Sequence, residues 1–448
     1  MSVLRNWANS RAFFGGVTVA LLATAAIWCF VSRRQVAHRV VSESMAPHLY
    51  GPHSRFVCDD CRFAFACGVE GHDLTASPVC PNCGHIISGQ AMMATPGDVI
   101  SVISWEVPLE HPQRWETVLF QHADDMHQLA VKRIVGLPGE QVAIDRGDLV
   151  VDGTCPARTL DQFCDTAILV YDDRYRLKQQ GQPPRWQRTR TDSDWRIAPQ
   201  TLLYESATPG SEPGRPELLA DSADVDWITY QHYDCSPDSR QRWSESSIND
   251  YLAYNQHLAT RRHYVTDLML RCRVSISGEG WMACRIRHGK GVVVAKISPA
   301  AGRIALWTST GPVEPEAKLT PPLTGGLREV LVEMAVYDHQ AVVALNGTTV
   351  IAARLDASAV RVKPASQPIS ISAHAATVGV EGTQILRDVY YLDPSGANPS
   401  WSLPRRLGPE EYFLLGDNPA VSIDSRHYFE DRPVQRKWLR GKALKVDR

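Results

Sequence analysis

Apolar residues form one long uninterrupted segment near the start of the chain. Residues 12–31 carry no charged side chain and lie between Arg11 and the pair Arg33-Arg34. As a helix, these 20 residues would be roughly 30 Å long, which is the thickness of the hydrocarbon core of a bilayer. We therefore predict a single transmembrane anchor over residues 12–31, preceded by a short N-terminal segment over residues 1–11.

Three alternative roles for this apolar segment agree less well with its sequence. A cleaved signal peptide would have a shorter apolar region and a small-x-small site, whereas Trp28-Cys29-Phe30-Val31 leads into two arginines. Lipid modification of Cys29 would normally need a small residue before the cysteine. A buried soluble helix is disfavoured because polar residues are almost absent around the segment. Arginines lie on both sides of it, so the positive-inside rule leaves the orientation open.

Short apolar runs further along the chain predict β-strands. A first group lies between about residues 92 and 156, and a second between about 263 and 393. The pair Asn346-Gly347 separates two such runs and predicts a two-residue hairpin. Many short strands of this kind suggest a sandwich or jelly roll for the second group. The individual predictions are residues 99–103, 118–120, 129–135, 149–151, 293–297, 330–336, 341–345, 348–352 and 412–415.

Length and charge narrow the classes of function. A chain of 448 residues is too long for one compact core, so two or three domains are expected. The formal net charge is −2, and the basic residues are scattered rather than gathered in a basic arm. We therefore expect no nucleic acid partner.

Four cysteines have the spacing of a zinc ribbon. Cys58 and Cys61 are separated by two residues, 18 residues follow, and Cys80 and Cys83 are again separated by two. Four thiolates leave no ligand position for water, so the zinc is predicted to be structural. The alternative is a pair of disulfides, which an extracytoplasmic location would favour. The neighbouring Cys67, His72 and His85 are interpreted as non-ligands.

A second pair of cysteines leaves a question open. Cys272 and Cys284 flank the turn Gly278-Glu279-Gly280 and could face each other across a hairpin. The sequence does not decide whether they form a disulfide.

Lys132 is unusual because of its surroundings on the predicted strand 129–135. Alternation places it on the same face as Ala130 and Ile134. Burial would lower the pKa of the amine and allow it to take a proton from a serine hydroxyl. The alternative is a surface strand whose lysine extends into water. From the strand alone, this surface interpretation is favoured.

Four segments of the sequence favour the interpretation of Lys132 as a buried base over that of a surface lysine. They are Ser42-Glu43-Ser44-Met45-Ala46-Pro47, Gly97-Asp98-Val99-Ile100, Val131-Lys132-Arg133-Ile134-Val135-Gly136-Leu137-Pro138-Gly139-Glu140, and Gly416-Asp417-Asn418 followed by Ser422-Ile423-Asp424-Ser425-Arg426. In content and order, behind an N-terminal anchor, they resemble the sequence boxes of type I signal peptidases. The resemblance implies a serine endopeptidase with a β-rich core and no catalytic cofactor.

Specific roles follow from the resemblance. Ser44 is expected to be the nucleophile and Lys132 its general base, with Ser422 orienting the lysine amine. The Ser42 hydroxyl and the Ser44 backbone amide are expected to hold the oxyanion. Asp424 and Arg426 resemble a structural ion pair of the family, and Asp417 a supporting position.

Some residues depart from the family pattern. Glu43 stands where a small residue is often found, Pro419-Ala420-Val421 replaces a polar stretch, and Glu140 stands for the commoner aspartate. None of these changes removes a catalytic group. They affect the expected substrate preference more than the expected reaction.

The predicted fold class is mainly β: a signal peptidase core with an N-terminal transmembrane helix, interrupted by a zinc ribbon and a jelly-roll-like β-sandwich. The last predicted strand of that sandwich, residues 385–392, resembles the closing strand of a concanavalin-like jelly roll. The predicted segments are a cytoplasmic N-terminus (1–11), the anchor (12–31), a first core segment with the nucleophile (32–57), the zinc ribbon (58–85), a second core segment with the general base (86–156), the inserted β domain (157–395) and a third core segment (396–448).

The resemblance also implies partners and a location. Secretory precursor proteins would be cut after small residues, and the chain would sit in the plasma (inner) membrane as a single-pass protein with its catalytic domain outside the cytoplasm. One alternative is a non-secretory Ser/Lys protease on the same core. Another is a membrane protein whose inserted domain binds a glycan or another surface ligand on an inactive peptidase core.

Overall fold

The computed structural model of the chain describes its β-rich region and leaves the N-terminal segment out. The predicted N-terminus (1–11) and anchor (12–31) therefore lie outside the described residues. No helix long and apolar enough to cross a membrane occurs among the residues that are described. These residues are 36–69, 77–88, 93–105, 111–121, 128–175, 183–198, 200–206, 211–237, 243–256, 258, 261–289, 291–313, 316–318, 326–356, 364–429 and 432–446.

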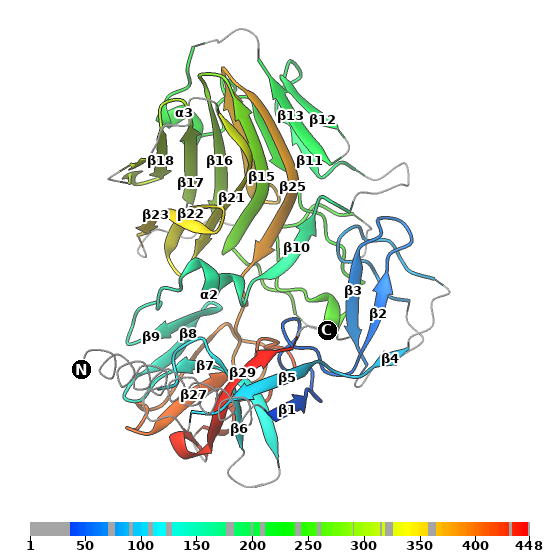
Figure 1. Ribbon diagram of the computed structural model, residues 1–448, viewed down its shortest axis with the longest axis vertical. Coiled ribbons are helices and arrows are strands. Elements are labelled where there is room, and N and C mark those ends of the chain that lie inside the picture. Colours follow the sequence, from blue (N-terminus) through cyan, green and yellow to red (C-terminus); the bar gives the residue numbers. More distant parts are fainter. Residues whose placement is uncertain are drawn as a thin grey trace, which may run out of the picture.

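The prediction of a mainly β protein is confirmed, with 47% of residues in strands and 6% in helices. A seven-stranded antiparallel sheet joins strands from the start, middle and end of the chain, and forms the lower region of the molecule in Figure 1. Its order is β1 (Val36–Arg39), β5 (Val99–Ile103), β29 (Leu439–Lys445), β6 (Thr117–Gln121), β7 (Leu129–Gly136), β27 (Glu411–Leu415) and β28 (Val434–Gln435).

Two small sheets accompany the seven-stranded sheet. One packs beside it through a shared hydrophobic cluster that includes Val142, Val135 and Phe413. The other carries the cysteine block and lies to the right in Figure 1. The first consists of β26 (Ser400–Ser402), β8 (Val142–Asp145) and β9 (Asp148–Val151), and the second of β3 (Ala64–Gly68), β2 (His53–Val57) and β4 (Ala94–Thr95).

Two eight-stranded sheets form the upper region of the molecule (Figure 1) and share one hydrophobic core. The first has the order β12 (Trp195–Ala198), β13 (Thr201–Glu205), β25 (Thr377–Arg387), β15 (Leu268–Ser277), β21 (Leu327–Tyr337), β22 (Gln340–Leu345) and β23 (Thr348–Arg354), with β10 (Ile168–Asp172) on β25. The second has the order β11 (Trp186–Arg188), β14 (Trp227–Tyr230), β24 (Ile369–His374), β16 (Trp281–His288), β17 (Gly291–Ser298), β18 (Arg303–Thr308) and β19 (Gly311–Pro312), with β20 (Ala317–Lys318) on β18. Their sheet-on-sheet packing forms a sandwich.

Helices are short throughout the described residues of the chain. The α2 helix begins at a capping box in which Thr159 and Gln162 satisfy each other's backbone amides. The helices are α2 (Leu160–Cys164), α3 (Arg215–Leu219), α4 (Ser425–Tyr428) and the 3-10 turns η1 (Ala253–Asn255) and η2 (Arg436–Trp438).

Several local predictions can be compared with the sandwich. Asn346 and Gly347 have positive φ angles of 50° and 77° between β22 and β23, as the hairpin prediction requires. The predicted strand 385–392 ends early, because β25 stops at Arg387. There the Asp388 carboxylate turns back to accept the backbone amide of Val389 and the guanidinium of Arg158.

The paired cysteines do not form a disulfide. Cys272 and Cys284 are free, buried thiols. They lie on β15 and β16, which belong to opposite sheets of the sandwich, and both point into its core. The suggested hairpin between them is therefore wrong.

Residues 253–256 join the inserted region to the rest of the molecule. Tyr254 stacks on Tyr50 with ring centroids 5.4 Å apart, and its hydroxyl donates to the Pro52 carbonyl over 3.2 Å. The next residue, Asn255, exchanges two hydrogen bonds with Asn418, of 2.6 and 2.9 Å. These contacts tie residues 253–256 to the segments around Ser44 and Asn418.

We predict that Tyr254→Ala lowers the stability of the catalytic region of the chain. Tyr254 is 1% exposed and packs against Ala46 and Ala66, so truncation leaves a cavity that costs on the order of 3 kcal/mol. Thermal unfolding of the full chain measures the change. Tyr264→Ala is the control, because Tyr264 is 51% exposed and its truncation should change stability by less than about 0.5 kcal/mol. Equal unfolding midpoints for the two variants would contradict the packing argument.

Candidate active site

Ser44 lies in a tight turn that follows β1. The turn is closed by backbone hydrogen bonds from Ala46 to Glu43 and from Leu49 to Met45. Met45 and Leu49 are buried in a cluster with residues of β5 and β29, so the turn is packed onto the seven-stranded sheet. Ser44 itself is 6% exposed. The packing and hydrogen bonds of the turn therefore hold the Ser44 hydroxyl at a fixed place against the sheet.

Lys132 meets Ser44 at that place. It lies in the middle of β7, where it pairs with Val118 of β6, and it is 4% exposed. Its Nζ donates a hydrogen bond of 2.5 Å to Ser44 Oγ. The interpretation of a surface strand with an exposed lysine is therefore wrong.

The surroundings of Lys132 bring its pKa closer to physiological pH than that of an exposed lysine. Burial lowers the pKa of Lys132 to about 8, since the ammonium loses its hydration. The carboxylates of Asp424 and Asp417 act in the opposite direction, and the guanidinium of Arg426 adds to the lowering. A substantial fraction of the amine is consequently neutral at a mildly alkaline pH.

Ser42 also lies beside the nucleophile. Its hydroxyl is 3.2 Å from Ser44 Oγ, which is within hydrogen-bond reach. A hydroxyl at this distance could turn toward an oxygen that bonds to the carbon attacked by Ser44. The geometry is thus compatible with the oxyanion role expected for Ser42.

Ser422 is buried close to the site, but its contact differs from the expected one. Its hydroxyl donates to Asp424 Oδ2 over 2.8 Å, and the hydrogen bonds of the described residues include none between Ser422 and Lys132. Asp424 is also held by Arg426 through two bonds of 2.8 Å. Ser422 thus contacts the carboxylate of Asp424, one of the charges that act on Lys132.

Gly416 permits this close packing. A side chain at position 416 would collide with the Ser422 hydroxyl and with the Ser44 carbonyl. The absence of a Cβ thus allows the end of β27 to approach the nucleophile turn.

Asp417 anchors a second ion pair behind the site. Arg133, the neighbour of Lys132, donates to its two carboxylate oxygens over 2.8 and 2.6 Å. His48 Nδ1 lies 3.1 Å from the same carboxylate. The charges of Arg133 and His48 outweigh burial and hold the pKa of Asp417 well below its usual range. Asp417 thus contacts both Arg133 and His48 behind the site.

Asn418 is a site residue to which the sequence assigned no role. Its backbone amide donates to the Ser44 carbonyl over 3.0 Å, and its side chain donates to the Glu43 carbonyl over 3.1 Å. It therefore clamps the nucleophile turn from behind. Asn255 was missed as well, and no signal around it in the sequence could have indicated a contact with Asn418.

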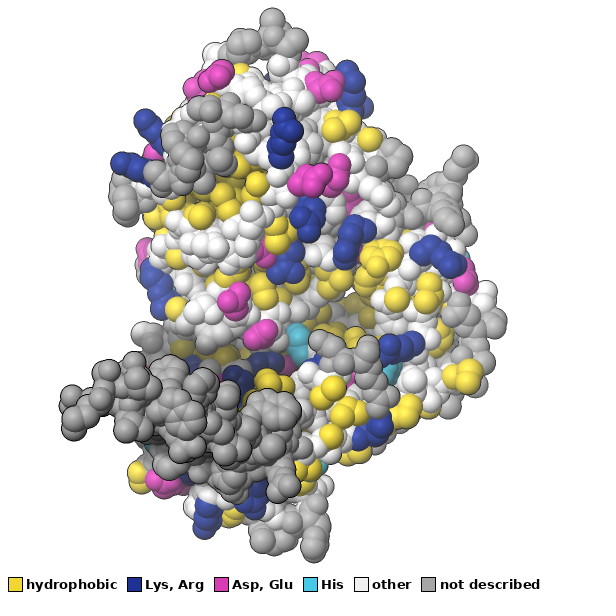
Figure 2. All heavy atoms as spheres, viewed as in Figure 1, with side chains coloured by type: hydrophobic (Ala, Val, Ile, Leu, Met, Phe, Trp, Pro, Cys, Tyr) yellow, Lys and Arg dark blue, Asp and Glu magenta, His cyan; other side chains and the backbone are white. Residues whose placement is uncertain are grey.

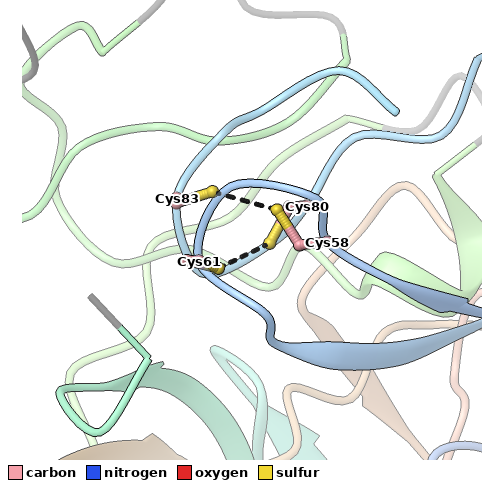
Figure 3. A group of neighbouring side chains, drawn as sticks. All are labelled: Cys58, Cys61, Cys80 and Cys83. Atoms are coloured by element: carbon pink, nitrogen blue, oxygen red, sulfur yellow. Dashed lines mark hydrogen bonds between the residues drawn. The ribbon is translucent and has the colours of Figure 1, made fainter. Parts of the chain in front are cut away.

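The four cysteines of the ribbon converge on one point (Figure 3). All four are buried, free thiols, and their sulfurs lie within 4.8 Å of one another. The separations Cys58–Cys83 and Cys61–Cys80 are both 3.6 Å. Four sulfurs about 2.3 Å from one zinc ion would lie about 3.8 Å apart. The cluster could hold a metal ion, and Cys67 is not a member of it because its sulfur accepts from Gln256 instead.

A cavity opens next to the nucleophile turn. It has a volume of about 470 Å³ and lies between the turn, the ribbon and the sandwich. Figure 2 shows a hollow in this region with hydrophobic side chains around it. Its lining includes Pro47, Phe65, Leu169, Tyr175 and Tyr251. The volume is within the range of peptide and small-molecule sites.

Part of the chain matches a known protein family. Residues 11–193 match the family model for signal peptidase, peptidase S26. The matched segment contains Ser44, Lys132 and the four ribbon cysteines, and it ends before Ser422. The match supports signal peptidase activity in general and secretory precursors as the substrate class. No curated protein matches the chain.

Solved structures resemble the chain only distantly. The carbohydrate binding module CBM66 from Bacillus subtilis has 10% identity over 44% of this chain and 93% of its own, with a TM-score of 0.27. Apo Crh5 transglycosylase has 10% identity over 58% of this chain and 92% of its own, with a TM-score of 0.28. Galectin LEC-6 from Caenorhabditis elegans has 11% identity over 27% of this chain and 83% of its own, with a TM-score of 0.19. At these scores the likeness supports no conclusion about a ligand.

We predict that kcat/KM for precursor cleavage rises as the pH increases through about 8. Lys132 has a pKa of about 8 in the folded chain, and only its neutral form can accept the Ser44 proton. The rate at pH 6 should be about 100-fold below the alkaline plateau. Initial rates on a model precursor, measured from pH 6 to the alkaline plateau, give this rise in kcat/KM. Lys442 of β29 has a side chain that is 42% exposed. The control variant Lys442→Ala should therefore leave the pH dependence of kcat/KM unchanged. A plateau that extends down to pH 6 would rule out a lysine base.

Proposed function

We propose that the chain is a membrane-bound signal peptidase that releases signal peptides from exported precursor proteins. Ser44 is the nucleophile and Lys132 the general base. The observation that carries this proposal is the 2.5 Å hydrogen bond between their buried side chains. The same contact argues against an inactive core that only carries a binding domain.

The reaction follows from the properties of the two side chains. The neutral Lys132 amine takes the Ser44 proton while Oγ attacks the scissile carbonyl and forms a tetrahedral intermediate. The resulting ammonium then protonates the leaving amine, and an ester to Ser44 remains. Lys132, neutral again, takes a proton from water, and the attacking hydroxide releases the signal peptide and restores the serine.

Two groups support these steps. The Ser42 hydroxyl and the Ser44 backbone amide donate to the oxyanion of the intermediate. The Asp424 carboxylate, held by Ser422 and Arg426, stabilises the ammonium form that exists between the two proton transfers. Its charge opposes the effect of burial, so the lysine can both take and return a proton.

The membrane aspect of the proposal rests on the sequence. Residues 12–31 would anchor the chain with the N-terminus in the cytoplasm and the catalytic region outside it. The nucleophile follows closely, with 12 residues between Val31 and Ser44. Such a short connection would keep Ser44 near the membrane surface, where the end of a signal peptide emerges.

The four ribbon cysteines would bind a structural zinc ion. Free thiols with sulfur separations of 3.6 Å fit a Cys₄ site after a small adjustment. The ion would hold the two cysteine knuckles together, because the hydrophobic cluster around them is small. It would take no role in the cleavage reaction.

We predict that Ser44→Ala abolishes cleavage without unfolding the chain. Loss of the nucleophile should lower kcat/KM by on the order of 10⁴ or more, and Ser42→Ala by about 10²–10³ through loss of one oxyanion donor. Release of a signal peptide from a model precursor, followed on a gel, measures both. Ser54→Ala is the control, since Ser54 is a buried serine on β2 that is expected to have no role in the reaction. Wild-type cleavage by Ser44→Ala would overturn the assignment.

We predict that Cys83→Ser loses about one zinc ion per chain relative to the wild type and melts at a lower temperature. Three thiolates bind zinc more weakly than four. Metal analysis of protein purified without chelator, together with thermal unfolding, measures both effects. The control Cys67→Ser should retain the ion, because Cys67 contacts Gln256 rather than the cluster. Two disulfides detected by mass spectrometry, without zinc, would contradict the assignment.

A further inference from the structure

A second group of potential metal ligands lies away from the ribbon. Asp148 begins β9, Cys155 follows that strand, and His339 lies in the turn between β21 and β22. Their ligand atoms all lie within 4.8 Å of one another. Cys155 is buried, and the other two are partly exposed. Two segments that are far apart in the sequence, residues 148–155 and the turn at His339, thus bring a carboxylate, a thiol and an imidazole to one point.

The chemistry of this group fits a transition metal. Thiolate and imidazole ligands favour zinc and related ions over magnesium or calcium, which prefer oxygen ligands. His339 Nε2 lies 3.9 Å from Asp148 Oδ2, which is too far for a hydrogen bond. Two such atoms bound to one zinc ion would be about 3.4 Å apart. A small movement would therefore bring both into coordination.

Space for a further ligand adjoins the group. A small cavity of about 20 Å³ is lined by Asp148 and His339 and also by Asp267 and His288. This volume is about that needed for one water molecule. A water or one of the additional side chains could complete a coordination shell of four.

The turn that carries His339 is held rigidly. Asp338 and His339 have φ angles of 46° and 54°, as in a type I′ hairpin, where glycine is usual at the second position. Arg158 fixes the turn through two bonds of 2.8 Å to the Asp338 carboxylate. Histidine is among the side chains that adopt this backbone conformation more often than most. The turn therefore holds His339 at a fixed place beside Asp148.

The position of the group gives it a mechanical role. Asp148 belongs to the small sheet that packs beside the catalytic sheet, whereas His339 belongs to the sandwich. In Figure 1, β9 lies below the lower ends of β22 and β23. An ion bound here would join the inserted sandwich to the small sheet beside the seven-stranded sheet.

We propose that Asp148, Cys155 and His339 form a second metal site, separate from the four-cysteine cluster, which binds zinc or a similar divalent transition ion and fastens the sandwich to the catalytic region. The site is not needed for the proton transfers between Ser44 and Lys132. It therefore goes beyond the proposed peptidase function and does not depend on it.

Zinc stoichiometry of the full chain tests the proposal. Wild-type protein, equilibrated with Zn²⁺ and freed of excess by gel filtration, should carry about one zinc ion more per chain than Cys155→Ser or His339→Asn. Asparagine tolerates the positive φ of the turn, so His339→Asn should fold. Added Zn²⁺ should raise the melting temperature of the wild type more than that of either variant. Cys164→Ser, which removes a thiol from α2, is the control and should bind as the wild type does.

A spectroscopic measurement separates this site from the ribbon. Co²⁺ added to metal-free protein should fill both sites, and Cys155→Ser should lose the part of the thiolate-to-cobalt absorption that belongs to this site while Cys83→Ser retains it. If either variant fails to fold, Asp148→Asn replaces it, with the same expected loss of one ion. Identical zinc content and identical cobalt spectra for the wild type and the site variants would overturn the proposal.

Discussion

The seven-stranded sheet and the segments packed on it are organised around a buried lysine whose charge is only partly compensated. Lys132 lies within the seven-stranded sheet, and its amine donates a hydrogen bond to Ser44. The amine has therefore lost most of its contact with water. Transfer of an ammonium from water into such surroundings is unfavourable, and the fold has to offset it. Asp424 and Asp417 supply negative charge nearby. Each of them is itself balanced by an arginine, Arg426 or Arg133, so neither carboxylate neutralises the lysine fully.

This arrangement explains why many segments meet at one point. Burial of Met45 and a hydrogen bond from Asn418 fix the nucleophile turn. A hydrogen bond from Ser422 and an ion pair with Arg426 fix Asp424. A misplaced partner would leave a buried charge or amide without a hydrogen bond, which costs more than the loss of an exposed contact. The hydrogen bonds and ion pairs among these buried polar groups therefore hold the site in one arrangement.

Several of these features were accessible from the sequence. The pattern of short apolar runs located β5, β7, β17, β21 and β22 closely. It could not show that Lys132 is buried, because that depends on the neighbouring strands β6 and β27, which are remote in the sequence. Family resemblance named Ser44, Lys132 and Ser422 but did not give the hydrogen bond from Ser422 to Asp424.

The least predictable region was residues 157–250. Its periodicity is weak, yet the structure contains β10–β14 there, because these strands cover the sandwich core mainly with isolated large side chains such as Trp186 and Trp195. The contacts of Tyr254 and Asn255 with the nucleophile turn have no local signal either. They arise only when two segments about 200 residues apart fold together.

The clamp of Asn418 on the nucleophile turn has a consequence for biosynthesis. Its hydrogen bond to the Glu43 carbonyl joins residues 375 positions apart, and its partner Asn255 comes from between them. A chain that is still being made on the ribosome contains Ser44 long before it contains Asn418. Contacts of such large sequence separation form late, after the entropy of closing the loop has been overcome. In the growing polypeptide, Ser44 therefore lacks this clamp until residue 418 has been synthesised and has folded back onto the turn.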